Sequence, residues 1–405
     1  MNTLPNHSAP APLPYAGIRV VEFTHMVMGP TCGLVLADLG AEVIKVEPMG
    51  HGRSGDATRK LLGSGAGFFP MFNRNKKSVT LDLESAEGKE AVLRLIATAD
   101  VVSENFKPGT MSKLGLNYDS LKERFPRLIY VSHKGFLPGP YEHRTALDEV
   151  VQMMGGLAYM TGRPGDPLRA GASVNDIMGG MFGAIGAMAA LAQREKTGKG
   201  QEVQSALFEN NVFLIAQHMM QYAVTGKPAA PMPARISAWA IYDVFKVRDG
   251  EQIFLAVVSN GAWRVFCDAF GLGDALRDDP RLTSNNDRVQ ARDWLMPLLR
   301  EKMAGYSAAH IARIFEDNGL PFAPITRPHD LFDDKHLNAT GTLAPVELPD
   351  GRVSKTVLLP ITLDGRHLEV RLSPPKLGEH SMEILTALGY TPEQARALAQ
   401  NQGGV

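Results

Sequence analysis

Asp176 is the carboxylate whose surroundings in the sequence most suggest chemistry. It opens an apolar stretch that contains Gly179, Gly180, Gly183 and Gly186. A glycine inside a helix costs about 1 kcal/mol relative to alanine, so this density of glycines needs a reason, such as close approach of a second backbone or of a ligand. A carboxylate beside so slim a helix could act as a nucleophile if it is ionised, partly desolvated and close to donors that hold an oxyanion.

The pair Asn175-Asp176 also suits a purely structural role. Asn and Asp are good N-cap residues, because their side-chain oxygens accept hydrogen bonds from the backbone N–H groups of a first helical turn. On the residues alone, helix capping is the favoured interpretation of Asp176.

Basic residues follow several of the expected strands: Arg74, Lys76, Lys77, Lys107, Lys113 and Lys134. Phosphate groups bind to cations and backbone amides at strand-to-helix junctions. A solvated surface position is the commoner role for any single lysine. As a set beside a parallel sheet, these residues suit a phosphate-bearing cofactor.

Several common motifs are absent from the sequence. The segment after the first expected strand, THMVMGPTCG, has no GxGxxG pattern, and GSGAG at 63–67 does not directly follow a strand, so an NAD or FAD site is disfavoured. P-loop, HExxH and GxSxG patterns do not occur. Cys32 and Cys267 have neither a disulfide framework nor metal-ligand spacing, and we expect no metal site.

The elements that must position these residues follow an α/β rhythm. Apolar, β-branched runs at 17–23 and 41–46 flank an expected helix at 31–39, which makes a βαβ unit and implies a parallel sheet. Further strands are expected at 100–103, 128–132 and 201–206. The helix that Asp176 opens, expected at 176–194, precedes the last of them.

A proline-rich linker at 226–235 is the best candidate for a domain boundary. The 405 residues are too many for one ordinary core. We therefore expect a large domain at 1–225, a smaller α+β domain at 226–340 and a C-terminal segment at 341–405.

The composition is that of a soluble globular protein. Forty-two Lys and Arg residues nearly balance 43 Asp and Glu residues, so a nucleic-acid partner is not expected. The apolar stretch at 178–191 is too short and too rich in glycine to span a membrane, and no signal-peptide pattern is seen. With two cysteines and no disulfide pattern, we expect a cytoplasmic protein.

Six segments carry a family resemblance. They are GIRVVEFTHMVMGPTCGLVLADLGAEVIKVEP, FNRNKKSVTLDLESAEGKE, ADVVSENFKPGTMSKLGLNYDSL, PRLIYVSHKGF, the Asp176 segment with TGKGQ, and LGEHSMEILTALGY. In this order, over about residues 17–390, they resemble the class III CoA-transferases. This family includes formyl-CoA:oxalate CoA-transferase and the carnitine CoA-transferase.

The resemblance implies a Rossmann-like large domain with a parallel sheet, to which the segment 341–405 returns, and an obligate homodimer of chains interlocked like rings. The catalytic aspartate of the family falls on Asp176, which reverses the preference for capping and suggests that the glycines admit CoA or the partner chain. CoA-binding positions fall on His25, Met26, Val27, Met28, Leu81, Lys113 and Lys134.

Three positions depart from the CoA-binding pattern of the family. Pro48 and Glu84 stand where formyl-CoA transferase has basic residues, and Thr145 replaces a lysine, with Arg144 beside it. We therefore expect other cations to contribute to the CoA phosphate site: Arg74, Lys76 or Arg144.

The same family contains α-methylacyl-CoA racemases, which use a His–Asp pair. Their histidine corresponds to Leu147, which cannot exchange a proton, so the residues favour a transferase. Asp148 and Glu149 are candidates to support the site, with helix capping the simpler role for Asp148. For His133 a structural role is the default.

The resemblance thus implies a CoA-transferase that moves CoA from an acyl-CoA donor, such as succinyl-CoA, to a carboxylic acid, through aspartyl anhydride and aspartyl-CoA thioester intermediates at Asp176. Acyl-CoA thioesters are substrates here, and no permanently bound cofactor is expected. A small dicarboxylate is the expected acceptor, and aromatic or carnitine-like acids are alternatives. Trp239 and Tyr242 are candidates to line its pocket, although core packing explains them equally well. A racemase or a non-catalytic acyl-CoA-binding protein remains the alternative function.

Overall fold

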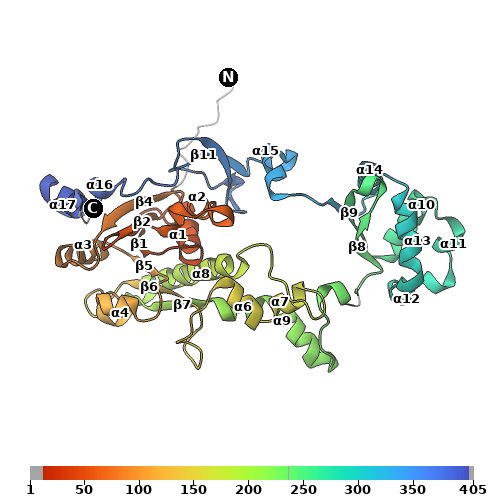
Figure 1. The fold of residues 1–405 in the computed structure, drawn as a ribbon, viewed down its shortest axis with the longest axis horizontal. Coiled ribbons are helices and arrows are strands. Elements are labelled where there is room, and N and C mark those ends of the chain that lie inside the picture. Colours follow the sequence, from red (N-terminus) through yellow and green to blue (C-terminus); the bar gives the residue numbers. More distant parts are fainter. Residues whose placement is uncertain (1–11, 236, 401–405) are drawn as a thin grey trace, which may run out of the picture. The chain divides into compact units, whose positions relative to one another are not determined.

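The structure is a computed structural model that describes residues 12–235 and 237–400 (Figure 1). The chain divides into two compact units. Unit 1 comprises Met1–Ala229 and Lys335–Val405, and unit 2 comprises Ala230–Asp334. These divisions lie close to the expected ones at 225/226 and 340/341.

Unit 1 is built on a sheet whose main strands are all parallel. They are β1 (Arg19–Phe23), β2 (Glu42–Gly50), β4 (Lys76–Leu81), β5 (Val101–Glu104), β6 (Ile129–Lys134) and β7 (Glu202–Ala206). Their order across the sheet is β4-β2-β1-β5-β6-β7, with the short β3 (Arg53–Ser54) paired antiparallel to the end of β2. The order reverses between β1 and β5, and open α/β sheets bind ligands at such a switch point.

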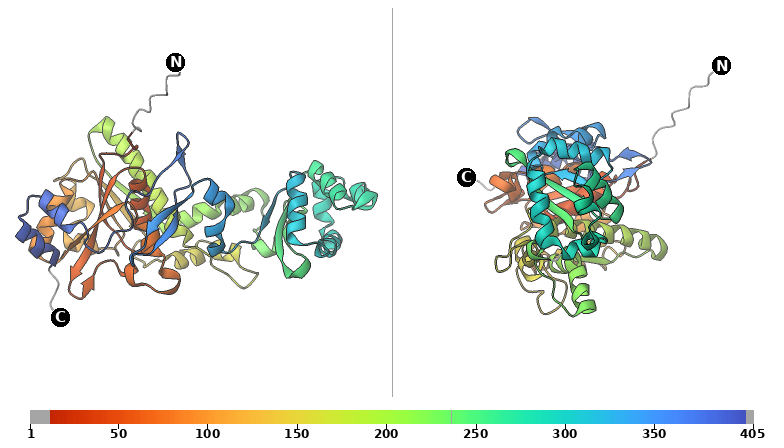
Figure 2. Two further views of the ribbon diagram at one scale, coloured as in Figure 1. Left: turned by 90° about the horizontal axis from the view of Figure 1, so that it is seen from above. Right: turned by 90° about the vertical axis from the view of Figure 1, so that its right-hand side faces the viewer.

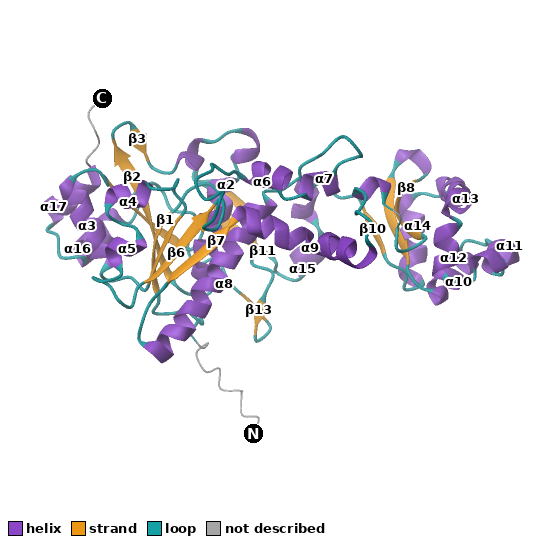
Figure 3. Cartoon of the chain, turned by 90° about the horizontal axis from the view of Figure 1, so that it is seen from below, coloured by secondary structure: helices purple, strands orange, loops and turns teal. Residues whose placement is uncertain are grey.

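Helices cover both faces of this sheet (Figures 2 and 3). α1 (Met28–Asp38) and α8 (Val174–Thr197) pack on the face that carries Val20 and Val131. The other face, which carries Val21 and Tyr130, packs against α3 (Ala86–Ile96), α4 (Thr110–Leu114), α5 (Tyr118–Leu121), α16 (Ser381–Ala387) and α17 (Pro392–Gln400). Both faces are therefore apolar, as the β-branched runs of a buried parallel sheet require.

The other elements of unit 1 surround this core. They are α2 (Phe68–Phe72), α6 (Asp148–Met154), α7 (Leu157–Thr161), α9 (Leu207–Thr225), α15 (Lys335–Ala339), the pair β11 (Leu343–Glu347) and β12 (Val353–Val357), and the pair β13 (Thr362–Leu363) and β14 (Arg366–His367).

Unit 2 has its own sheet and its own core. Its antiparallel strands are β8 (Ile241–Lys246), β9 (Gln252–Val257) and β10 (Phe322–Pro324), in the order β10-β9-β8. Its helices are α10 (Asn260–Ala269), α11 (Gly273–Arg277), α12 (Asn285–Gln290), α13 (Arg292–Ala304) and α14 (Ala308–Asp317). Trp263, Phe266 and Phe315 are buried between them. This unit is α+β, as expected for the smaller domain.

The glycines of α8 face neighbours within the same chain. A Cβ added at Gly180 would lie 2.4 Å from the carbonyl oxygen of Met28, and one at Gly183 would lie 2.4 Å from the His133 ring. A Cβ at Gly186 would meet Val203 at 2.5 Å. The glycines thus admit α1 and the sheet, and the expectation that they admit CoA or a second chain is wrong.

α8 is also the one helix among the described residues that is long and apolar enough to cross a membrane. It packs against α1, β6, β7, α9 and α6. This packing identifies α8 as a core helix of an α/β fold.

We expect Gly180→Ala to lower the free energy of unfolding by about 1–3 kcal/mol, because the new Cβ overlaps the backbone of α1. This cost exceeds the gain of about 1 kcal/mol in helix propensity. Urea denaturation followed by circular dichroism measures the change.

Gly261→Ala in α10 is the matched control, since its Cβ would meet only the Ser259 Oγ at 3.8 Å. This substitution should leave stability unchanged or raise it slightly. Equal stabilities of the two variants would contradict the close contact between α1 and α8.

Candidate active site

A pocket of about 230 Å³ lies at the carboxyl ends of β1, β5 and β6. We call it the Asp176 pocket. The loops that follow these three strands line it, together with the first turns of α6 and α8. Its lining includes six of the residues predicted to catalyse the reaction or bind CoA: His25, Met26, Met28, Lys134, Arg144 and Asp176.

Asp176 lies inside the first turn of α8, which begins at Val174, two residues earlier than expected. The hydrogen-bond acceptor for this turn comes from α6. Asp148 Oδ2 accepts hydrogen bonds from the backbone N–H groups of Asn175 (2.8 Å) and Asp176 (3.2 Å). The interpretation of Asp176 as the capping residue is therefore wrong, and its carboxylate lines the pocket instead.

Burial raises the pKa of Asp176 to about 7, and the negative charge of Asp148 adds to the rise, while Arg169 opposes it. The positive end of a helix by itself favours an ionised carboxylate. Desolvation and a like charge outweigh that field. Near neutral pH, Asp176 is thus poised between its two protonation states, as expected of a catalytic group.

The loop that follows β1 is fixed by a side chain from the loop after β5. The N–H of His25 donates to Asn105 Oδ1 (2.9 Å), and Asn105 Nδ2 donates to the carbonyl oxygen of His25 (2.7 Å). The rings of His25 and Phe106 stack with their centroids 5.7 Å apart. Met26 has a φ of 62°, in the left-handed region that non-glycine residues seldom occupy and that is common at functional sites.

The sequence did not single out Asn105 and Phe106 as site residues. Their signal was positional, because they directly follow a strand that lies beside β1 at the switch point.

Three cations line the Asp176 pocket: Lys107, Lys134 and Arg144. Lys134 Nζ lies 3.1 Å from Glu104 Oε1, and the Arg144 guanidinium lies 4.1 Å from the centre of the Tyr141 ring. These groups give the pocket positive charge opposite its carboxylates, which suits a ligand that carries phosphates.

Arg74 and Lys76 are not available to a ligand. Both side chains are fully buried, with Arg74 Nη2 2.6 Å from Asp38 Oδ2 and Lys76 Nζ 2.8 Å from Glu22 Oε1. Because these ion pairs lie in the interior, a phosphate cannot reach either cation. The prediction that they hold CoA phosphates is wrong.

Three further predicted residues lie outside the lining of the Asp176 pocket. The side chain of Val27 packs against Leu34 and Phe72, and that of Leu81 belongs to the core between the sheet and α3. Lys113 is exposed on α4.

Trp239 and Tyr242, the candidates for the acceptor pocket, belong to unit 2, where their ring centroids lie 5.0 Å apart.

His133 lines the pocket from β6, and Leu147 lines it just before α6. His133 Nε2 lies 3.1 Å from Ser103 Oγ, and burial lowers the pKa of His133 to about 3, with Lys134 adding to the effect. An imidazole of so low a pKa is a poor base at neutral pH. His133 is therefore a poor candidate to abstract a proton from a substrate.

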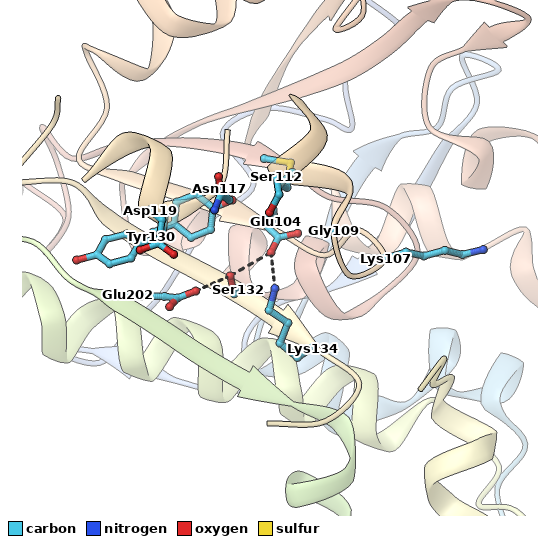
Figure 4. A pocket seen from close by; sticks show the side chains of 12 residues that line it. Glu104, Lys107, Gly109, Ser112, Asn117, Asp119, Tyr130, Ser132, Lys134 and Glu202 are labelled. Atoms are coloured by element: carbon cyan, nitrogen blue, oxygen red, sulfur yellow. Dashed lines mark hydrogen bonds and ion pairs between the residues drawn. The ribbon is translucent and has the colours of Figure 1, made fainter. Parts of the chain in front are cut away.

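A second, more polar pocket shares Lys107 and Lys134 with the first (Figure 4). In it, Ser132 Oγ lies 3.0 Å from Glu104 Oε1 and 3.2 Å from Glu202 Oε1, and Lys134 points toward the same Glu104 oxygen. Glu104 thus holds Lys134 at the border of the two pockets.

We expect Asp176→Asn to stabilise the folded protein above pH 7 by roughly 1–3 kcal/mol. The pKa of the folded carboxyl, about 7, lies above its ordinary value of 3.8, so the folded wild type loses stability as the pH rises between these values. Denaturation at several pH values measures the gap between variant and wild type, which should open from about pH 4 to pH 7.

Asp364→Asn, in the exposed turn between β13 and β14, is the control and should show no such gap. A gap for Asp176→Asn that does not change with pH would contradict the raised pKa.

The pattern of CoA-transferase family III matches residues 15–381 of the chain. The succinate–glutarate CoA-transferase of Agrobacterium fabrum is 34% identical over 96% of this chain and 98% of its own length. The formyl-CoA:oxalate CoA-transferase of Rhodopseudomonas palustris (strain ATCC BAA-98 / CGA009) is 34% identical over 93% of each chain.

Solved structures give the same result. A CaiB/BaiF family protein from Brucella suis is 35% identical and superimposes with a TM-score of 0.82, over 93% of this chain and all of the other. A hypothetical protein from Mycobacterium tuberculosis, 32% identical, has a TM-score of 0.80 over 93% of this chain and all of its own. The resemblance of the six segments is confirmed: the chain belongs to CoA-transferase family III and is an enzyme of the class III CoA-transferases.

Proposed function

We propose that this enzyme moves CoA from an acyl-CoA donor, such as succinyl-CoA, to a small dicarboxylic acid, with Asp176 as the nucleophile. The observation that carries the proposal is the Asp176 carboxylate, which lines a pocket among the loops after β1, β5 and β6. The relatives named for glutarate, oxalate and mesaconate transfer support a dicarboxylate acceptor.

The proposed reaction starts when ionised Asp176 attacks the thioester carbonyl of the donor. The C–S bond breaks, CoA leaves as its thiolate, and a mixed anhydride joins the donor acyl group to Asp176. The thiolate then attacks the Asp176 carbonyl, which releases the donor acid and leaves an aspartyl-CoA thioester.

The second half of the reaction mirrors the first. The acceptor carboxylate attacks the aspartyl thioester and displaces the thiolate, which gives an anhydride between the acceptor and Asp176. Attack of the thiolate on the acceptor carbonyl releases the new acyl-CoA and restores the Asp176 carboxylate. Every intermediate is an activated acyl species, so the transfer needs no ATP.

In this proposal, the loop after β1 stabilises the oxyanions that form when a carbonyl group is attacked. The N–H groups of Asn175 and Asp176 are engaged by Asp148, and that of Ile177 donates to the Ser173 carbonyl oxygen. From this loop, Met28 and Met26, whose backbone is left-handed, line the pocket, and we propose that backbone N–H groups here hold the oxyanions.

We propose that unit 1 is a Rossmann-like domain. Three of its cations, Lys107, Lys134 and Arg144, hold the phosphates of CoA in this proposal. We further propose the obligate, interlocked homodimer and a cytoplasmic location, with no nucleic-acid or membrane partner. The dimer is supported by large apolar side chains that the described chain leaves exposed on α6 to α9: Met153, Tyr159, Met181, Ile185, Phe213 and Met220.

We expect the wild type, incubated in deuterated water with succinyl-CoA and a panel of carboxylic acids, to form a new acyl-CoA without deuterium at carbon α. Asp176→Ala should abolish this transfer, because the acyl group then has no carboxylate to join. Mass spectrometry of the CoA esters measures both results. Hydroxylamine should trap an Asp176 hydroxamate in the wild type.

Asp364→Asn serves as the control of unchanged activity. Deuterium uptake without transfer would identify a racemase, and binding without either reaction a non-catalytic protein. Transfer by Asp176→Ala at the wild-type rate would exclude Asp176 as the nucleophile.

The pKa of Asp176, raised to about 7, predicts an acid limb in the pH profile of kcat/KM. We expect the rate to fall about tenfold per pH unit below pH 6, as the nucleophile becomes protonated. Release of CoA thiolate in the first turnover, measured from pH 5 to pH 9, tests this. An acid limb near pH 4 would mean that the nucleophile has an ordinary carboxyl pKa.

A further inference from the structure

The nucleophile stands beside a second carboxylate that is fixed and buried. Asp148 is 7% exposed, and its Oδ2 atom is held by the first turn of α8. Its other oxygen, Oδ1, accepts a hydrogen bond from Gln152 Nε2. Two neighbouring carboxylates oppose each other's ionisation, and a nearby cation offsets this effect.

Arg169 supplies that cation from the segment that leads into α8. Its Nη2 atom lies 3.9 Å from Asp148 Oδ1, and its Nη1 atom forms an ion pair with Glu149. Nε donates to the carbonyl oxygen of Ala170 (3.1 Å), whose own N–H donates to Gln152 Oε1 (2.8 Å). The guanidinium is therefore held at the start of α6 by its contacts with Asp148 and Glu149, and the adjoining backbone at Ala170 is bound to Gln152.

Other charged or titratable groups face Asp176 from the elements around the pocket. From the loops and strands come His25, Lys107, His133, Lys134, Glu142 and Arg144, and from α6 comes Asp148, while the exposed Glu149 pairs with Arg169. Of the charged side chains near Asp176, Asp148 and Arg169 have the strongest effect on its pKa, which Asp148 raises and Arg169 lowers.

We propose that Arg169 is a positioning residue that holds Asp148 at the start of α8 and offsets its charge, so that a larger fraction of Asp176 is ionised at neutral pH. The inference rests on the proposed role of Asp176 as the nucleophile. It assigns to Arg169 no contact with substrate. Arg169 acts through Asp148 and through its field at Asp176.

The test is the pH profile of CoA release for Arg169→Met. Without the guanidinium, the acid limb of kcat/KM should move up by about one pH unit, which lowers the rate at pH 7 about fivefold. Above pH 9 the rate should return to the wild-type value, because Asp176 is then ionised in both proteins. Arg169→Lys keeps the charge and should restore most of the shift.

Arg163→Met removes an exposed cation from the same segment and should leave the profile unchanged. Arg169→Gln keeps hydrogen-bonding capacity without charge and should behave as Arg169→Met does. It replaces Arg169→Met in the test if the methionine variant folds poorly. A loss of rate that is equal at every pH would reduce Arg169 to a structural role and overturn the proposal.

An alternative role for Arg169 is to bind the second carboxylate of the acceptor. In that case Arg169→Met would raise the acceptor KM for dicarboxylates but not for monocarboxylates of equal length, with an unmoved acid limb, and the proposal would be wrong. Asp176→Ala separates this failure from failure of the proposed function, because it is inactive whenever Asp176 is the nucleophile.

Discussion

One carboxylate oxygen, Asp148 Oδ2, accepts hydrogen bonds from the backbone N–H groups of Asn175 and Asp176 at the start of α8. Those groups are the positive end of the helix, and without this acceptor the side chain of Asp176 could fold back to cap them. Because a residue from α6 satisfies them instead, the Asp176 carboxylate is directed to the pocket and has a fixed negative neighbour. The same contact thus affects both where the Asp176 carboxylate lies and how readily it ionises.

The sheet and the glycines of α8 bring this helix start to the pocket. In the parallel register Phe23 lies beside Glu104 and Glu104 beside Ser132, so the loops after β1, β5 and β6 emerge at one edge. α8 runs from this edge toward the start of β5, where Arg194 Nη2 lies 2.8 Å from Asp100 Oδ1. Side chains at Gly180 and Gly183 would hold α8 away from α1 and His133. Asp176 would then lie farther from the loops after β1, β5 and β6.

The sequence was sufficient for the parallel sheet, because β-branched runs alternate with helical segments. Family motifs pointed to Asp176 and to four other residues of the lining: His25, Met26, Met28 and Lys134. The sequence failed for Arg74 and Lys76, whose carboxylate partners Asp38 and Glu22 are 36 and 54 residues away in the chain. A cation that follows an expected loop has the same local pattern whether it faces solvent or a buried acid. The cap of α8 was missed for the same reason, since Asp148 is 28 residues from Asp176 and only the packing of α6 on α8 joins them.

The raised pKa of Asp176 reflects two opposing demands on a carboxylate nucleophile. A more basic carboxylate attacks a thioester faster, but a smaller fraction of it is ionised at a given pH, so the rate is greatest when the pKa is near the working pH. Burial and Asp148 raise the pKa, and Arg169 limits the rise. Burial alone cannot set the pKa to the best value, because the degree of burial depends on the shape of the pocket, and that shape must also fit the substrate. The Arg169 guanidinium lies outside the lining of the pocket, 3.9 Å from Asp148 Oδ1, and can adjust ionisation without changing the shape that the substrate meets.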